Sequence, residues 1–523
     1  MRVFERWPLL VLGSLILLAG IDRAHLLVEF GFRCTSTDEV IIWHIARDYG
    51  HGIFREWYMY GQNYNPMLEA LLGAPFMRLG AAPWIVLPIV TSCLALVPFW
   101  SFALWHFRRG ELSAAFGFAL MPLLLPVEWG MMTTITRGFV HGIALIALLP
   151  WVLSLNRMWW RFLLASLIAG AALLCNPNSL VFLAAIYTTV MLSHWREFKF
   201  WSMSLLGTIP ALVFWYKAHH FFDDHHWDMV HSIDPGDLHF APTLLLKAFT
   251  QLDSHFATLF PIWWPNGHLA LIALVVLAVL LWRVGSRSHA TGVCVAVAAI
   301  LLSLCVVKVH NGCDSVFFAR SRMFLAIPLL LCWSLAGLWK SRSPSPNLAL
   351  GFIVVALAYV GLKWFRVPEV VKREMTHQQG SQVREAWLDN VFSQCYSIGS
   401  AASDSGAEVV VPIRWPQLRV EPDAHFNAYL LCYACSFAVP DLPPTFGPGY
   451  DRRSWVHDRY KGKPAGNVLF VGGDPLAWEH VVQNYPTKIN VEKTGLLMHS
   501  LHCDTLTIET LSIRLGIDDD IGR

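Results

Sequence analysis

The chain has 523 residues, of which 55% are hydrophobic and only 15% are charged, and its mean hydropathy is +0.46. A soluble protein of this length does not need so much apolar surface, so the composition excludes an ordinary globular protein and indicates a membrane protein. The formal net charge of +2 is close to zero and gives no electrostatic reason to expect a nucleic-acid partner.

Apolar segments long enough to cross a bilayer account for most of the first 365 residues. About eleven segments have the length that a bilayer core of about 30 Å requires. They lie at 8–21, 83–107, 113–128, 138–155, 161–174, 179–194, 201–216, 267–282, 291–307, 323–339 and 348–364. We therefore predict a polytopic all-α membrane domain over residues 1–365.

The composition changes at residue 366 to that of a soluble protein. A charged stretch at 371–392 is typical of a helix, and three runs are typical of strands. These runs lie at 408–413, 467–472 and 506–513. Residues 366–523 are therefore predicted to form a small external α+β domain.

Basic residues determine the predicted orientation of the membrane domain. Arg2 and Arg6 precede the first segment, and the second segment ends at Arg108 and Arg109. Every predicted inner loop carries Lys or Arg, as the positive-inside rule requires, so the loop 23–82 faces outward and the N-terminus is cytoplasmic. The first segment also fits a secretory signal peptide, whose removal would leave the later topology unchanged.

The outer loop carries two adjacent acidic residues, Asp38 and Glu39, shortly after the first segment. They begin an amphipathic run whose apolar residues recur at helical spacing. Such a helix would hold a carboxylate at the membrane surface, as a catalytic site would require. The alternative is that Thr37 caps the helix and the two acids complement the helix dipole.

Three arginines lie on the predicted outer side, where the positive-inside rule supplies no reason for them. Arg320 and Arg322 precede the segment 323–339, and Arg137 precedes the segment 138–155. A guanidinium group offers a planar fork of donors and stays charged, which suits a phosphate whose lipid tail lies in the bilayer. Extension of these side chains toward lipid headgroups is the alternative.

Four polar residues are candidate contacts for a sugar or an acceptor: Gln62, Asn63, Tyr64 and His141. A polar turn explains the first three equally well, and a satisfied histidine inside the membrane explains the fourth.

The long outer loop 217–265 begins with a histidine-rich run. A helix there would place His219, Asp223 and His226 on one face, with His225 beside them, and such a cluster can bind a divalent metal. The run meets no fixed ligand spacing, so a solvated loop is the alternative. We expect no cofactor to be required, with a divalent metal as the one open alternative.

Four cysteines fall in the predicted external domain, where an oxidising compartment allows disulfides. They are Cys395, Cys432, Cys435 and Cys503. The spacing of Cys432 and Cys435 also fits a redox or metal pair, but no second such pair accompanies it. We therefore predict structural disulfides.

The combination of these features resembles the C-type (GT-C) integral membrane glycosyltransferases. The features are the outer Asp38-Glu39 pair, Tyr-Gly-Gln at 60–62, the Leu-Glu-Ala-Leu-Leu-Gly-Ala-Pro helix that leads into the second segment, and the Arg-Met-Phe-Leu-Ala-Ile-Pro run at 322–328. The branch it resembles most contains the protein O-mannosyltransferases and the aminoarabinose lipid A transferases. Met323 stands where that branch has Tyr in its Arg-Tyr-x-x-Pro element.

The resemblance implies that Asp38 is the catalytic base, with Glu39 as its neighbour, and that the run at 322–328 lies near the donor phosphate. We expect transfer of a sugar, with inversion, from a polyprenyl-phosphate donor to a hydroxyl of a lipid, glycan or protein acceptor. An enzyme on the outer face of a bacterial inner membrane has no cytosolic nucleotide sugars to use. The alternative is a transporter or flippase of a lipid-linked saccharide, but the two halves of the chain show no convincing repeat.

Overall fold

Helices dominate the first 376 residues in the computed structural model, which describes residues 6–225, 233, 236–261, 266–339, 344–376, 385–412, 428–446, 462–472, 487–490, 498–507 and 510. The membrane part contains α1 (Trp7–Leu26), which continues as a π-helical turn (Leu27–Gly31), α4 (Pro83–Arg108), α5 (Leu112–Leu124), α6 (Val127–Met132), α7 (His141–Ile146), α8 (Leu149–Leu153), α9 (Met158–Cys175), α10 (Leu180–His194), α11 (Phe198–Asp224), α12 (Thr243–Thr250), α13 (Leu252–Phe256), α14 (His268–Arg283), α15 (Arg287–Ser303), α16 (Val307–His310), α17 (Ile327–Trp339) and α18 (Pro346–Thr376). Every segment that the sequence predicts to cross the bilayer contains one of these helices.

Six helices in the described ranges are long and apolar enough to cross a membrane. They are Trp7–Gly31, Pro83–Arg108, Met158–Cys175, Phe198–Asp224, Arg320–Trp339 and Pro346–Thr376. Four further apolar helices have 10–17 residues, and one of them, His141–Leu153, is divided into α7 and α8, with Pro150 in the first turn of α8. The chain is an integral membrane protein, with fewer full-length apolar helices than predicted spans.

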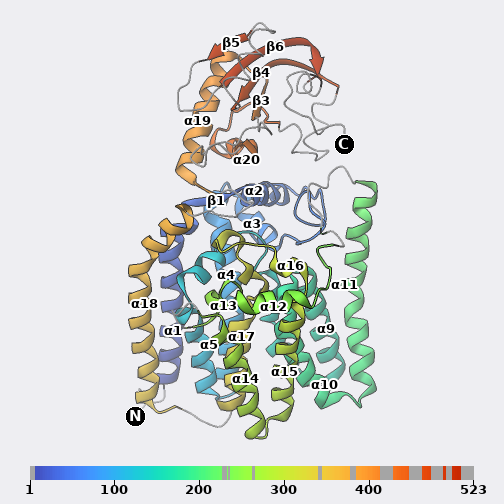
Figure 1. Ribbon diagram of the computed structural model, residues 1–523, viewed down its shortest axis with the longest axis vertical. Helices are drawn as coiled ribbons and strands as arrows, with labels where there is room; N and C mark the ends of the chain where they lie inside the picture. Colours follow the sequence, from blue (N-terminus) through green and yellow to red (C-terminus); the bar gives the residue numbers. More distant parts are fainter. Residues whose placement is uncertain are drawn as a thin grey trace.

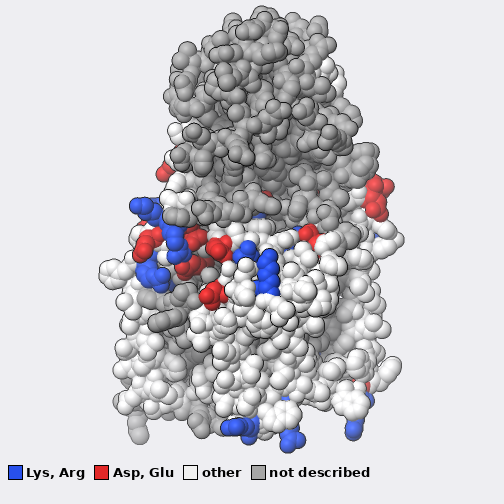
Figure 2. All heavy atoms as spheres, viewed as in Figure 1, with Lys and Arg blue, Asp and Glu red and all other residues white. Residues whose placement is uncertain are grey.

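Charged side chains gather at the two ends of the helical bundle, and uncharged surface lies between them (Figure 2). Inside the bundle, Lys363 of α18 forms an ion pair with Asp22 of α1, and Trp364 Nε1 donates to the same carboxylate at 3.0 Å. An ionised carboxylate in apolar surroundings requires such a partner, so the pair fixes α18 alongside α1.

Two helices outside the bundle lie across its upper end, α2 (Thr37–Gly50) and α3 (Leu68–Arg78) (Figure 1). Strand β1 (Cys34–Ser36) leads directly into α2 and pairs antiparallel with β2 (Glu385–Trp387). Sequence-distant parts of the chain are therefore joined immediately before Asp38.

The C-terminal part contains α19 (Leu388–Ser405), α20 (Ala428–Ala438) and four strands, β3 (Val409–Pro412), β4 (Pro464–Val471), β5 (Thr487–Asn490) and β6 (Met498–Thr507). The strand order is β3-β4-β6-β5, with β3 and β4 parallel and the other neighbours antiparallel. The α+β character predicted from the sequence is confirmed. The single helix predicted at 371–392 is wrong, because α18 ends at Thr376 and β2 precedes α19.

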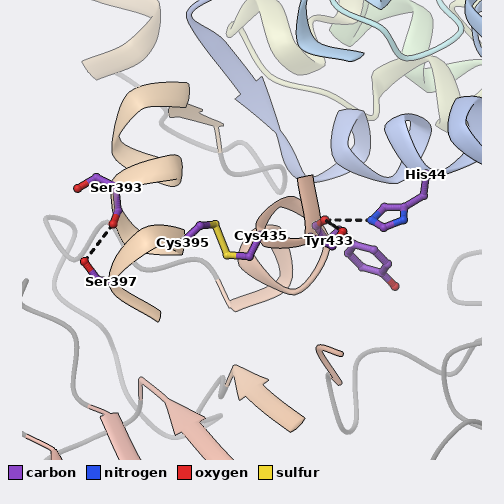
Figure 3. Close-up of a disulfide and its surroundings, with 7 residues drawn as sticks. His44, Ser393, Cys395, Ser397, Tyr433 and Cys435 are labelled. Carbon is purple, nitrogen blue, oxygen red and sulfur yellow. Dashed lines mark hydrogen bonds between the residues drawn. A yellow bond between two sulfur atoms is a disulfide. The ribbon is translucent and has the colours of Figure 1, made fainter. Parts of the chain in front are cut away.

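A disulfide joins Cys395 of α19 to Cys435 of α20 (Figure 3). This bond confirms that a structural bridge uses one cysteine of the Cys432 and Cys435 pair, whereas the side chains of Cys432 and Cys503 lie outside the described residues. On the same helix, the Tyr433 carbonyl lies 2.9 Å from His44 Nε2 of α2. Helix α20 is thus fixed between α19 and α2.

Candidate active site

Asp38 and Glu39 occupy the first turn of α2, whose N-cap residue is Ser36 rather than Thr37. Asp38 lies in an ion pair between its Oδ2 atom and Nη2 of Arg137, and 22% of its side chain is exposed. Its Oδ1 atom has no hydrogen-bond partner among the described residues. One carboxylate oxygen is therefore held by a cation while the other is free to accept a proton.

Glu39 faces inward, with 6% of its surface exposed. Its Oε1 atom accepts from the Thr136 amide at 3.2 Å, and its Oε2 atom accepts from the Ser36 hydroxyl at 3.0 Å. Burial raises the pKa of Glu39 from 4.5 to about 7, although these two hydrogen bonds oppose the shift. The two adjacent acids thus differ in environment, because Glu39 is buried whereas Asp38 is partly exposed.

This shift makes stability depend on pH. Below pH 4.5 Glu39 is protonated in both the folded and the unfolded chain, whereas between pH 4.5 and about 7 only the unfolded chain ionises fully. The contribution of Glu39 to stability is therefore complete below pH 4.5 and is lost as the pH rises to about 7. We expect Glu39→Gln to flatten the decline of the melting temperature over this range.

Thermal unfolding of the purified protein between pH 4 and pH 8 measures this effect. The partly exposed residue Glu29, which pairs only loosely with Arg33 at 3.6 Å, provides the control variant Glu29→Gln. A constant difference between wild type and Glu39→Gln at every pH would contradict a raised pKa for Glu39.

Arg137 connects Asp38 to the loop before α17. Its Nη1 atom donates to the Phe317 carbonyl, and its guanidinium lies 5.4 Å from the ring centres of both Phe139 and Phe318. Its side chain is only 6% exposed. The orientation of Arg137 is therefore fixed by an anion, a carbonyl and two aromatic faces.

Arg322 lies on the same two aromatic rings as Arg137, 3.9 Å from the centre of Phe318 and 5.8 Å from that of Phe139. Its donors reach three carbonyls, those of Phe318, Ala319 and Asn311, at 2.8–2.9 Å. No carboxylate pairs with it among the described residues. Arg322 thus brings a positive charge, only 6% exposed, that has no opposite charge paired with it in the described part of the chain.

Arg320 is less constrained, with 23% of its side chain exposed. Its Nε atom donates to the His310 carbonyl at 3.3 Å, and Nη1 lies 3.4 Å from Asp314, whose side chain is 80% exposed. Both distances are long for strong hydrogen bonds. Of the three predicted phosphate arginines, Arg320 is the one with donors most available to another partner.

Tyr64 lies within the electrostatic range of this cluster. Burial and then the charge of Asp38 raise its pKa, while Arg137 and Arg322 oppose the shift. Lys308, which was not among the predicted site residues, has its Nζ atom 5.8 Å from the Tyr64 ring centre. The structure therefore brings Tyr64 next to the predicted base and the predicted phosphate arginines.

The other predicted polar contacts are more dispersed. Asn63 Oδ1 accepts from the Ile233 amide at 3.2 Å, and Gln62 Oε1 is buried without a partner in the described ranges. His141 is 0% exposed and faces Glu69, so in this structure it does not reach the surface.

The histidine-rich run ends α11, and the candidate ligands His219, Asp223 and His225 each contact a different neighbour. His219 stacks on Trp215 and His225 on Phe221, while Asp223 pairs with His220 at 2.8 Å. His226 lies outside the described residues. Within the described ranges no three His, Cys, Asp or Glu side chains form a group that could hold a metal ion.

Glu69 is a site residue that the sequence did not single out. It is the second residue of α3, and its Oε2 atom accepts from the Gly138 amide at 3.0 Å. The only sequence signal was its place near the start of an amphipathic helix in the outer loop. That signal does not predict contact with a residue 69 positions away.

Three carboxylates from α2 and α3 thus hold three consecutive residues. Glu39 binds the amide of Thr136, Asp38 binds the side chain of Arg137, and Glu69 binds the amide of Gly138. We call residues 133–140 the arginine loop. Helices α2 and α3 therefore hold the arginine loop next to Arg322, which lies over the ring of Phe139 in this loop.

Comparison with solved structures identifies a similar fold. ArnT from Cupriavidus metallidurans in the apo state superposes with a TM-score of 0.53 and 12% sequence identity, over 93% of this chain and 98% of ArnT. ArnT bound to undecaprenyl phosphate gives the same TM-score and coverage with 11% identity. The resemblance to the aminoarabinose lipid A transferase branch is therefore confirmed at the level of the fold. No protein-family model matches the chain, and no curated protein matches its sequence.

Proposed function

We propose that this protein is a membrane glycosyltransferase that moves a sugar from a polyprenyl-phosphate donor to an acceptor hydroxyl. The observation that carries the proposal is the pairing of Asp38, which has one free carboxylate oxygen, with Arg137 beside the unpaired charge of Arg322. A base next to concentrated positive charge suits a reaction in which a hydroxyl loses its proton while a phosphate leaves. The ArnT fold supports the proposal, because one ArnT structure is bound to undecaprenyl phosphate.

The reaction proceeds in one displacement. Asp38 Oδ1 accepts the proton of the acceptor hydroxyl as the hydroxyl oxygen attacks the anomeric carbon. The bond between that carbon and the phosphate oxygen breaks, and the electron pair leaves with the polyprenyl phosphate. Attack from the opposite face inverts the sugar, and no covalent intermediate on the protein is needed.

The arginines divide the stabilisation of the departing phosphate. Arg322 contributes mainly charge, because backbone carbonyls occupy its donors. Arg320 contributes donors, because its own contacts are long. Arg137 joins the phosphate side to the base. These cations neutralise a monophosphate leaving group, so the proposal requires no metal ion.

The proposal places the site on the outer face of a bacterial inner membrane, with residues 366–523 also external. Gln62, Asn63 and Tyr64 belong to the loop between α2 and α3 and are proposed to contact the sugar or the acceptor. The acceptor is a lipid, a glycan or a protein that presents a hydroxyl at this surface.

Arg320→Ala should raise the KM for the polyprenyl-phosphate donor and leave the KM for the acceptor unchanged, because it removes phosphate donors only. We expect a rise of about ten- to a hundredfold, as one charge-assisted hydrogen bond contributes about 1.5–3 kcal/mol. Donor saturation curves of the purified enzyme measure the change. Arg33→Ala is the matched control, since Arg33 is a 56% exposed arginine near the same end of the bundle. An unchanged donor KM would remove Arg320 from the phosphate site.

Proteoliposomes that contain a labelled polyprenyl-phosphate sugar test the function itself. Transfer predicts that the label leaves the lipid and appears on an added envelope acceptor, with free polyprenyl phosphate as the second product. A transporter or flippase would instead move the intact lipid between leaflets. Label that changes leaflet while it stays on polyprenyl phosphate would therefore reject the proposal.

A further inference from the structure

We propose that Glu69 and His141 form a positioning pair that sets Arg137 for the reaction at Asp38. The inference rests on the proposed function and assigns His141 a role inside the protein in place of a sugar contact. It concerns two ionisable side chains that the reaction above does not use and that are both 0% exposed.

The pair is built from two separate helices. Glu69 lies in the first turn of α3, and His141 is the first residue of α7. His141 Nε2 lies 3.2 Å from Glu69 Oε2 and 3.2 Å from the Glu69 amide nitrogen. Depending on the tautomer of the ring, Nε2 either accepts from the Glu69 amide or donates to Glu69 Oε2, and each of these hydrogen bonds holds Glu69 next to His141.

Glu69 in turn holds the backbone of Gly138, the residue after Arg137. Its Oε2 atom accepts from the Gly138 amide at 3.0 Å, and the Gly138 carbonyl accepts from Asn176 Nδ2 at 3.0 Å. Gly138 has φ = +74°, a conformation that favours glycine. A Cβ atom there would lie 3.4 Å from the His141 ring. Both the amide and the carbonyl of Gly138 are thus hydrogen-bonded, in a backbone conformation that glycine adopts readily.

Glu39 holds the residue on the other side of Arg137 through the Thr136 amide. With both neighbouring residues fixed, the backbone of Arg137 has little freedom, and its side chain is directed at Asp38. Small displacements matter at such a point, because a shift of about 1 Å can cost about a hundredfold in rate.

The composition of the pair argues against simple packing. Glu69 Oε1 and His141 Nδ1 are buried, and neither has a hydrogen-bond partner among the residues that the structure describes. Buried groups of this kind cost free energy that two apolar side chains would avoid. A role in constraining a functional arginine explains why a buried acid and a histidine, rather than two apolar side chains, occupy these positions.

The test compares Glu69→Ala, Glu69→Gln and His141→Phe in the full-length enzyme. We expect Glu69→Ala and His141→Phe to lower kcat by about ten- to a hundredfold with the donor KM unchanged. Glu69→Gln should recover most of kcat, because its amide oxygen can still accept from the Gly138 amide. Glu111→Gln is the matched control, since Glu111 pairs with His106 at 2.5 Å near the end of α4 opposite the site.

A double variant separates positioning from general destabilisation. If Glu69 acts through Arg137, Glu69→Ala should add almost nothing to the loss caused by Arg137→Gln. Multiplicative losses in the double variant, or equal kcat values for Glu69→Ala and wild type, would overturn the inference. If Glu69→Ala does not fold, the same comparison of single and double variants is made with His141→Phe and Arg137→Gln, and it tests the inference in the same way. Absence of transfer by the wild-type enzyme would instead reject the proposed function.

Discussion

Asp38→Asn is expected to lower kcat at least about a hundredfold, the smaller end of the usual range for general acid–base catalysis. The amide keeps the shape of the side chain and can still accept from Arg137 through its oxygen, but it cannot take the acceptor proton. Because that proton moves only as the transition state forms, the KM values should change much less than kcat. Initial rates with saturating donor and acceptor measure the loss.

Asp389→Asn is the matched control for the helix-dipole explanation. Asp389 is the second residue of α19, as Asp38 is of α2, and it is exposed in the first turn. Both substitutions remove an acid that complements a helix dipole. Near-normal turnover by Asp38→Asn would exclude Asp38 as the base, and loss of activity in Glu39→Gln would then identify its neighbour.

Arg137→Gln is expected to lower kcat by about 10²–10³-fold, the usual cost of removing a donor aimed at developing charge. The substitution leaves Asp38 without its cation and removes one of the two guanidiniums that share the rings of Phe139 and Phe318. Arg137→Lys should recover only part of kcat, because a single ammonium cannot reach both Asp38 and the Phe317 carbonyl as the fork does.

Single-turnover rates with preformed donor complex distinguish catalysis by Arg137 from donor binding. A normal single-turnover rate in Arg137→Gln, together with a lowered melting temperature, would assign Arg137 to the fold alone. A raised donor KM with normal kcat would place it in ground-state binding of the phosphate.

The sequence was sufficient to predict a helical protein with several membrane spans, because apolar length is a direct physical requirement for crossing a bilayer. It also located the start of α2, since an acid pair before a helical apolar pattern is a local signal. The shorter helices were harder to predict. In 138–155 the sequence is apolar except for His141 and Ser154, but the helix is interrupted between α7 and α8, and hydropathy does not register such an interruption.

The partners of the site residues could not be predicted in the same way. Asp38 and Arg137 were both candidates, yet nothing local indicated that residues 99 positions apart would form an ion pair. The role of Glu69 could not be predicted either, because it depends on a backbone amide rather than on a recognisable partner side chain. The carbonyl contacts of Arg322 also follow from the path of the loop 311–319, which composition does not encode.

Helix α2 is joined to the C-terminal part at two points, through β1 and β2 before Asp38 and through His44 and Tyr433 further along. The helix that carries the proposed base is therefore shared between regions that a hydropathy profile would separate at residue 365. Exchange of the external region between related enzymes would place a foreign β2 and α20 against a native α2. Recombination would preserve activity only when residues 34–50 are inherited together with the external region, so the two regions constrain one another in evolution.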